Sequence, residues 1–174
     1  MKLQQAKQQE EMAVSFLQRS AGQWNSQRRY YTLKEDSSTE QMVSHLKISF
    51  LEMGDAKLEE LAQAHGLAQK LKAGSSVFWE SKKEDGKIIS RGTTILGVLG
   101  NILYRDRGFA TPKPVFAHYR CAESTNMALR TEYNGSVFEE EFKLIGKIYR
   151  TRQTIISRAG EELMIGQYLE RRLE

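Results

Sequence analysis

Residues 136–172, SVFEEEFKLIGKIYRTRQTIISRAGEELMIGQYLERR, show the most informative strand pattern of this chain. They read as three strands, over 137–145, 148–158 and 163–172, which are separated by a Gly-Lys turn and an Ala-Gly-Glu turn. Links this short join antiparallel neighbours, because parallel strands need a long crossover connection. We therefore predict an antiparallel meander in the C-terminal part of the chain.

Charged side chains lie on strand faces that are otherwise apolar. Because side chains alternate across a strand, Glu140 shares a face with Phe138 and Phe142, whereas Arg150 and Arg152 share one with isoleucines. A charge inside a dry core is costly unless another group pairs with it. These strands therefore predict a barrel whose cavity suits an apolar ligand that carries charges of its own.

The rest of the chain repeats the short-strand pattern. Further strands are expected over 23–34, 41–53, 75–81, 87–98, 101–106, 115–121 and 126–133. The turn signals between them include the Glu-Asp-Ser-Ser segment at 35–38. Two helices are expected: an N-terminal helix over 3–20, and a second helix near 55–73 that begins after Asp55 as N-cap and stops at Gly74.

About ten short strands with hairpin-length links indicate an all-β protein, an antiparallel calycin-like barrel on the plan of lipocalins and fatty-acid-binding proteins. A barrel of this strand number can enclose a cavity for a small molecule. The length of 174 residues and the 40% hydrophobic content are enough for one core. We predict a single domain over 1–174, with the N-terminal helix in 1–20 and the barrel in 23–173.

Composition narrows the classes of partner and compartment. The net charge of +4 is spread along the chain, so nucleic-acid binding is not expected, whereas an acidic protein or an anionic ligand fits. Cys121 is the only cysteine, which precludes an intramolecular disulfide and indicates a reducing compartment. The sequence shows neither a signal peptide nor an apolar run long enough to span a membrane, so we expect a cytoplasmic protein.

The first strand carries the same mixture of charge and aromatic surface, because Arg28 shares a face with Trp24 and Tyr30. One interpretation is a structural cation–π pair between Arg28 and Trp24 that closes the barrel end. The other places Arg28 with Arg150 and Arg152 as planar forks for ligand carboxylates. The sequence leaves both open.

The candidate acid–base residue is Glu140, for which the sequence again leaves two interpretations. It forms a buried ion pair with one of the arginines, or it accepts hydrogen bonds from ligand N–H groups or exchanges protons with them. Glu132 and Glu170 are weaker candidates of the same type. Cys121 and His118 fall on opposite faces of one strand, so we expect no nucleophile–base pair there, and the scattered histidines predict no metal site.

Three segments together carry a resemblance to a known family: residues 20–28 (SAGQWNSQR), 149–158 (YRTRQTIISR) and 164–170 (MIGQYLE). In this order and spacing they resemble the S-type (CpcS/CpeS-type) phycobiliprotein lyases, over nearly the whole chain. The resemblance implies a lipocalin-like fold and binding of an open-chain tetrapyrrole, phycocyanobilin or a related bilin, as substrate rather than as a permanent cofactor. It also implies transfer of the bilin to a cysteine of an apo-phycobiliprotein subunit of the phycocyanin or allophycocyanin type, by thioether formation.

The resemblance further implies roles for individual residues. Arg28, Arg150 and Arg152 would hold the propionates, with Trp24 and Tyr30 as further ligand contacts, and Glu140, the catalytic candidate, would contact the pyrrole nitrogens. Tyr31 departs from the family pattern, since many members have a histidine at this position.

The implied setting is the cytosol of a cyanobacterium or the stroma of a plastid, and the implied mechanism is chaperone-like, with the nucleophile supplied by the acceptor. A homodimer and a heteromeric pair with a second lyase subunit remain open. Two rival functions remain as well: a carrier of bilin, haem or fatty acid that transfers nothing, and a scaffold for antenna assembly.

Overall fold

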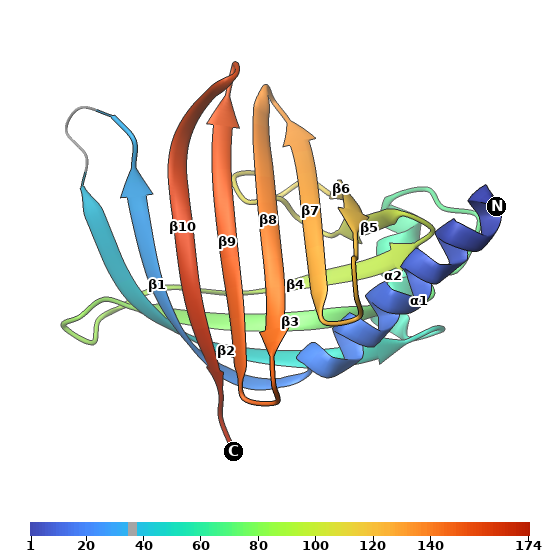
Figure 1. Cartoon of the computed structure of the whole chain (residues 1–174), viewed down its shortest axis with the longest axis horizontal. Helices are drawn as coiled ribbons and strands as arrows, with labels where there is room; N and C mark the ends of the chain where they lie inside the picture. Colours follow the sequence, from blue (N-terminus) through green and yellow to red (C-terminus); the bar gives the residue numbers. More distant parts are fainter. Residues whose placement is uncertain (35–37) are drawn as a thin grey trace.

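The strands predicted from the turn pattern close into a ring. In a computed structural model that describes residues 1–34 and 38–174, ten antiparallel strands form a closed barrel, accompanied by two helices (Figure 1). The helices are α1 (Lys2–Ser20) and α2 (Ala56–Ala64). The strands are β1 (Gly22–Thr32), β2 (Thr39–Glu52), β3 (Ala73–Lys82), β4 (Ile88–Leu99), β5 (Ile102–Arg105), β6 (Val115–Arg120), β7 (Asn126–Tyr133), β8 (Ser136–Ile145), β9 (Tyr149–Arg158) and β10 (Glu161–Arg172).

Each strand pairs with its neighbours in sequence, and β1 completes the ring against β10. At this seam Trp24 lies opposite Arg172, and Tyr30 lies opposite Gly166. Figure 1 shows β7 to β10 side by side, crossing in front of β2, β3 and β4. The predicted antiparallel barrel is therefore confirmed, while the turn predicted at 35–38 falls mostly on residues 35–37, outside the described part of the chain.

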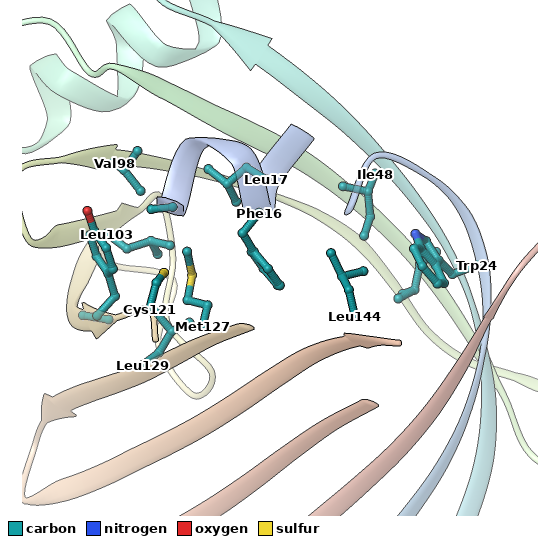
Figure 2. Packing of buried hydrophobic residues seen from close by; sticks show 14 residues of the cluster. Phe16, Leu17, Trp24, Ile48, Val98, Leu103, Cys121, Met127, Leu129 and Leu144 are labelled. Carbon is teal, nitrogen blue, oxygen red and sulfur yellow. The ribbon is translucent and has the colours of Figure 1, made fainter. Parts of the chain in front are cut away.

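Helix α1 packs against β2, β3, β4 and β7 and covers one end of the barrel (Figure 1). Its apolar side chains Phe16 and Leu17 enter the buried cluster shown in Figure 2. The Gln9 amide holds the helix in place, because it donates to the Cys121 carbonyl at 2.7 Å and accepts from the Cys121 N–H at 2.8 Å. Other labelled members of the cluster are Trp24, Ile48, Val98, Leu103, Met127, Leu129 and Leu144.

The second helix is shorter than predicted. Asp55 is its N-cap, as expected, and its carboxylate accepts from the Lys57 N–H at 2.9 Å. The helix ends at Ala64 because Gly66 takes a left-handed conformation, and the Leu67 N–H reaches back to an earlier carbonyl of the last turn. Gly74, the predicted stop, lies in β3 instead. The sequence pattern was misleading because Leu67 and Leu71, which follow the helix, still pack on its apolar face.

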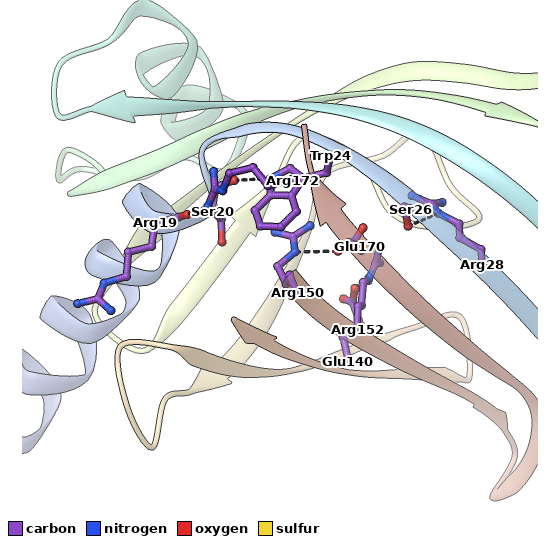
Figure 3. Close-up of polar contacts among 10 residues, drawn as sticks. All are labelled: Arg19, Ser20, Trp24, Ser26, Arg28, Glu140, Arg150, Arg152, Glu170 and Arg172. Atoms are coloured by element: carbon purple, nitrogen blue, oxygen red, sulfur yellow. Dashed lines mark hydrogen bonds and ion pairs between the residues drawn. The ribbon is translucent and has the colours of Figure 1, made fainter. Parts of the chain in front are cut away.

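Of the two interpretations left open for Arg28, the cation–π pair with Trp24 is wrong. The guanidinium over the Trp24 ring at 4.2 Å belongs to Arg172, which the β1–β10 register places directly opposite, and Arg150 approaches the same ring at 5.2 Å (Figure 3). Arg172 also donates to the carbonyls of Arg19 and Ala21 at the end of α1. One arginine thus ties the helix, the first strand and the last strand together.

Neither helix in the described residues is both long enough and apolar enough to pass through a lipid bilayer.

We expect Arg172→Lys to lower the free energy of unfolding by about 2 kcal/mol, because an ammonium group lacks the planar fork that reaches several carbonyls while lying on an indole. The matched control is Arg171→Lys, at an exposed neighbouring position of the same strand. Urea unfolding followed by tryptophan fluorescence measures both. Equal stability of the two variants would show that the seam does not depend on the guanidinium.

Candidate functional site

The barrel contains a cavity of about 280 Å³. Phe16 and Leu17 of α1 cover it at one end, and most of its wall is apolar or aromatic. Its charged lining is entirely cationic and consists of Arg28, Arg105, Arg107, Arg150 and Arg152. The carboxylates that balance part of this charge lie just behind the cavity wall, on β8 and β10.

Glu140 is the centre of the first ion-pair group. Strand alternation turns it inward between Phe138 and Phe142, and its side chain is fully buried. One carboxylate oxygen accepts from Arg105 Nη2 at 2.8 Å and the other from Arg152 Nη2 at 2.5 Å. The ion-pair interpretation of Glu140 is therefore confirmed, with Arg152 as a predicted partner and Arg105 as a partner that the sequence reasoning missed.

The inward orientation of Arg105 could have been predicted from the sequence. It lies in a strand that the sequence predicted, two residues after the buried Leu103, so the alternation that identified Arg150 and Arg152 turns it inward as well. The strand is only four residues long, which gave the alternation little weight. Arg105 and Glu140 are 35 residues apart in the sequence, so no local pattern predicts that they pair.

The arginines keep Glu140 ionised. Burial by itself would raise the pKa of its carboxyl group, but the charges of Arg105 and Arg152 outweigh burial and hold that pKa below its usual value. In return, Glu140 raises the pKa of Arg152 in spite of the burial of that guanidinium. The three groups therefore form one charged unit at neutral pH.

Glu170 is the centre of a second group (Figure 3). The β9–β10 register sets it opposite Arg150, whose Nε donates to its Oε1 at 2.7 Å. Burial would again raise the pKa of the carboxyl, and Arg150 again brings it below its usual value. The second oxygen, Oε2, is buried and has no hydrogen-bond partner among the described residues. Of the two weaker candidates, Glu170 thus belongs to the site region, whereas Glu132 is exposed and pairs with Arg130 on the outer surface.

An aromatic group completes this wall. The ring of Tyr168 contacts the guanidiniums of Arg28 and Arg152, whose Cζ atoms lie 5.1 and 4.8 Å from its centre, and it packs edge-on against Tyr30 with 5.7 Å between ring centres. Burial raises the pKa of Tyr168 to about 12, so its hydroxyl stays protonated. Trp24 lies behind the wall, against Arg150, and does not line the cavity.

The structure thus brings Arg28, Tyr30, Arg150 and Arg152 together on one side of the cavity, as the sequence predicted. Arg28 differs from the other two arginines. Its Nε donates to Ser26 Oγ at 3.2 Å, and no carboxylate in the described residues forms an ion pair with it. The site can therefore accept an apolar molecule with an acidic group, and Arg28 has donors free to bind that group.

Cys121 is no nucleophile in this arrangement. It is buried beneath α1, and burial raises the pKa of its thiol to about 11. His118 faces outward on the opposite side of β6. The sequence expectation that these two residues form no catalytic pair agrees with this geometry.

Comparisons with known proteins identify relatives. A family model described as "CpeS-like protein" matches residues 12–173. The chain is 57% identical over 167 residues to "Putative phycocyanobilin lyase CpcS 2" of Nostoc sp. strain PCC 7120, which covers 94% of this chain and 92% of that protein. It is 46% identical over 164 residues to "Putative chromophore lyase CpcV" of Picosynechococcus sp. strain PCC 7002, which covers 92% and 81%.

Among solved structures, the S-type phycobiliprotein lyase CpeS from Guillardia theta is similar, with a TM-score of 0.75 over 91% of each chain. The two sequences are 21% identical, so this likeness supports the fold alone.

Acid should destabilise the protein through Glu140 and Glu170. Because both pKa values are lower in the folded state than the ordinary glutamate value of 4.5, the stabilisation is complete above that pH and is lost as the pH falls through the folded pKa values. We expect the free energy of unfolding to decrease steadily as the pH is lowered below about 4.5. Urea titrations across this pH range measure it, and a flat profile would contradict the assignment.

At neutral pH, Glu140→Gln should cost about 3 kcal/mol, since it leaves two buried guanidiniums without an anion. The same variant should have a shallower acid slope because one titrating group is gone. The control is Glu139→Gln on the same strand, where the carboxylate is exposed and pairs with Arg130; its cost should stay below about 0.5 kcal/mol.

Proposed function

Because the chain belongs to the CpeS-like protein family, we propose that it is a chromophore lyase, which binds an open-chain tetrapyrrole and attaches it to a cysteine of a phycobiliprotein subunit. The observation that carries the proposal is the cavity itself, with apolar and aromatic walls and only arginines as charged lining. A bilin has the complementary chemistry: a flexible apolar body, two propionates and several pyrrole nitrogens. Phycocyanobilin is the first bilin to test, since a relative's name specifies it.

Guanidinium N–H groups are suitable donors for the propionates. We assign one of them to Arg28, which has free N–H groups and no carboxylate partner in the described residues. Arg150 and Arg152 contact the same ligand with donors left over from their ion pairs, and their main task is to hold Glu170 and Glu140 in place. Tyr30 packs against the ligand beside them, and Trp24 supports Arg150 from behind.

Negative charge near the pyrrole nitrogens stabilises a protonated bilin. Glu140 does not line the cavity and both of its oxygens are bound to arginines, so it acts through its charge: it stays ionised at neutral pH, holds Arg105 and Arg152 in the wall and donates no proton. Glu170 adds a second buried negative charge to the same wall.

The bond-forming step uses the thiol of the acceptor. The thiolate adds to the ethylidene carbon of the bilin, a carbon–sulfur bond forms at the expense of the exocyclic double bond, and the thiol proton ends on the chromophore. The addition needs no oxidant, reductant or leaving group. The lyase contributes orientation of the bilin and exclusion of water and competing nucleophiles.

We extend the proposal to the setting of the protein. The whole chain, 1–174, acts as one bilin-binding domain with no permanent cofactor, in the cytosol of a cyanobacterium or the stroma of a plastid. Its acceptor is a subunit of the phycocyanin or allophycocyanin type. It works as a homodimer or with a second lyase subunit, and mass determination with and without such a subunit distinguishes the two.

The proposal is tested by titrating the purified protein with phycocyanobilin and then adding an apo-phycocyanin or apo-allophycocyanin β subunit. We expect a shifted bilin absorption band on binding and then a fluorescent, acid-stable adduct on the acceptor. A shifted band without an adduct on either acceptor would instead favour a carrier. No shift at micromolar protein would remove the bilin from the proposal and favour an assembly scaffold.

Cys121→Ala should bind phycocyanobilin and support adduct formation at the wild-type rate, because the nucleophile belongs to the acceptor and Cys121 is buried away from it. The small cavity left by the sulfur should cost about 1 kcal/mol of stability. Acceptor subunits lacking the target cysteine are the control, and they should receive no bilin. A Cys121→Ala protein that binds bilin but transfers none would overturn this assignment.

A further inference from the structure

The five arginines of the cavity fall into two classes. Arg105, Arg150 and Arg152 each form an ion pair with a buried glutamate. Arg28 and Arg107 form none with the carboxylates of the described residues. Arg107 was not predicted as a site residue, and it lies in the loop 106–114 between β5 and β6, close to the end of the short strand that carries Arg105.

Arg107 rests on a platform built by three residues. Its guanidinium lies 5.4 Å from the centre of the Trp79 ring, within the range of a cation–π contact. Trp79 Nε1 donates to Ser90 Oγ at 3.1 Å, which fixes the orientation of the indole. Gly92 makes room for it, since a Cβ there would lie 2.6 Å from Trp79 Cζ2. The indole therefore presents a fixed face to the guanidinium.

The backbone on the N-terminal side of Arg107 is held to β4. The Asp106 carboxylate accepts from Thr94 Oγ1 at 2.7 Å and from the Ile95 N–H at 3.0 Å. The Asp106 N–H donates to the Ile95 carbonyl at 3.1 Å. The acidic side chain next to Arg107 is thus bound to β4, and it makes no ion pair with its neighbour.

The backbone on the C-terminal side is held to β7 and β8. Phe109 stacks on Phe138 with 4.8 Å between ring centres. Tyr133 also stacks on Phe138, with 5.0 Å between ring centres. The Ala110 N–H donates to the Tyr133 hydroxyl at 2.8 Å. A loop fixed at both sides offers a preorganised guanidinium, which lowers the entropic cost of binding an anion.

The position of Arg107 matches the size of the ligand. Arg107 and Phe109 line the cavity and are also exposed, so they mark where it opens to solvent. A cavity of about 280 Å³ lies below the range of roughly 300–1,000 Å³ that is usual for drug-sized ligands. A four-ring tetrapyrrole therefore extends beyond this cavity, and the opening beside the platform is one of two places for it; the other is an adjoining pocket of about 1020 Å³ that shares Arg28, Arg152 and Tyr168.

We propose that Arg107, held on the face of Trp79 at the cavity opening, is a second carboxylate-binding subsite that takes one propionate of the tetrapyrrole while Arg28 takes the other. This inference rests on the proposed function. Two guanidiniums that form no ion pair within the described residues, on different elements, then meet two ligand carboxylates, which holds the middle of the bilin at two points.

The test compares Arg107→Gln with wild type for binding of phycocyanobilin and of its dimethyl ester, which lacks both carboxylates. We expect Arg107→Gln to raise the Kd for phycocyanobilin about tenfold, as for loss of one charge-assisted hydrogen bond, and to leave the Kd for the ester unchanged. The control Arg91→Gln removes the same charge from an exposed position of β4 outside the cavity lining, and it should change neither constant.

The possible failures are distinguishable. If wild type binds phycocyanobilin and Arg107→Gln binds it equally well, this subsite is wrong while the proposed function stands. If Arg107→Gln weakens acid and ester alike, Arg107 supports the structure of the opening and binds no carboxylate. An equal effect of Arg91→Gln would assign the loss to overall charge and overturn the subsite. If wild type fails to bind phycocyanobilin at all, the proposed function fails first.

Discussion

The interior of this barrel is organised by the pairing of buried carboxylates with buried guanidiniums. Neither Glu140 nor Glu170 could remain ionised in an apolar barrel without its arginines, and those arginines would be equally costly without the glutamates. The ion pairs join β8 to β5 and β9, and β9 to β10. They hold the wall at fixed separations, so the space in front of it stays open as a cavity and is not filled by collapsed side chains.

The same pairing separates structural charge from charge available to a ligand. Three arginines share two buried carboxylates within the protein, whereas Arg28 and Arg107 keep donors that are matched by no carboxylate of the described residues. An apolar cavity with two such cations is complementary to an apolar dianion. A bilin lyase of this kind needs no nucleophile of its own, because binding, orientation and shielding of the bilin are what the acceptor thiol lacks.

Much of the barrel was predictable because turns and alternation are local properties. Turn residues separated ten strands, and alternation assigned Glu140, Arg150, Arg152 and Arg28 to the inner face. The length of α2 was not predictable from periodicity alone, since the leucines after Gly66 pack on the helix from a turn and not from a continued helix. Arg107 lies in a loop, where no periodicity applies, and only the platform of Trp79 identifies it.

The number of strands, their antiparallel order and the charges on inward faces were predictable from local sequence, because each of these follows from neighbours within a few residues. Which charges pair with one another depends on the folded barrel. Whether Trp24 meets Arg28 or Arg172 depends on the register at the seam of the ring, and whether Glu140 meets Arg105 depends on strands 35 residues apart. Which residues pair across distant strands is set when the barrel closes, and the local spacing of residues in the sequence does not predict it.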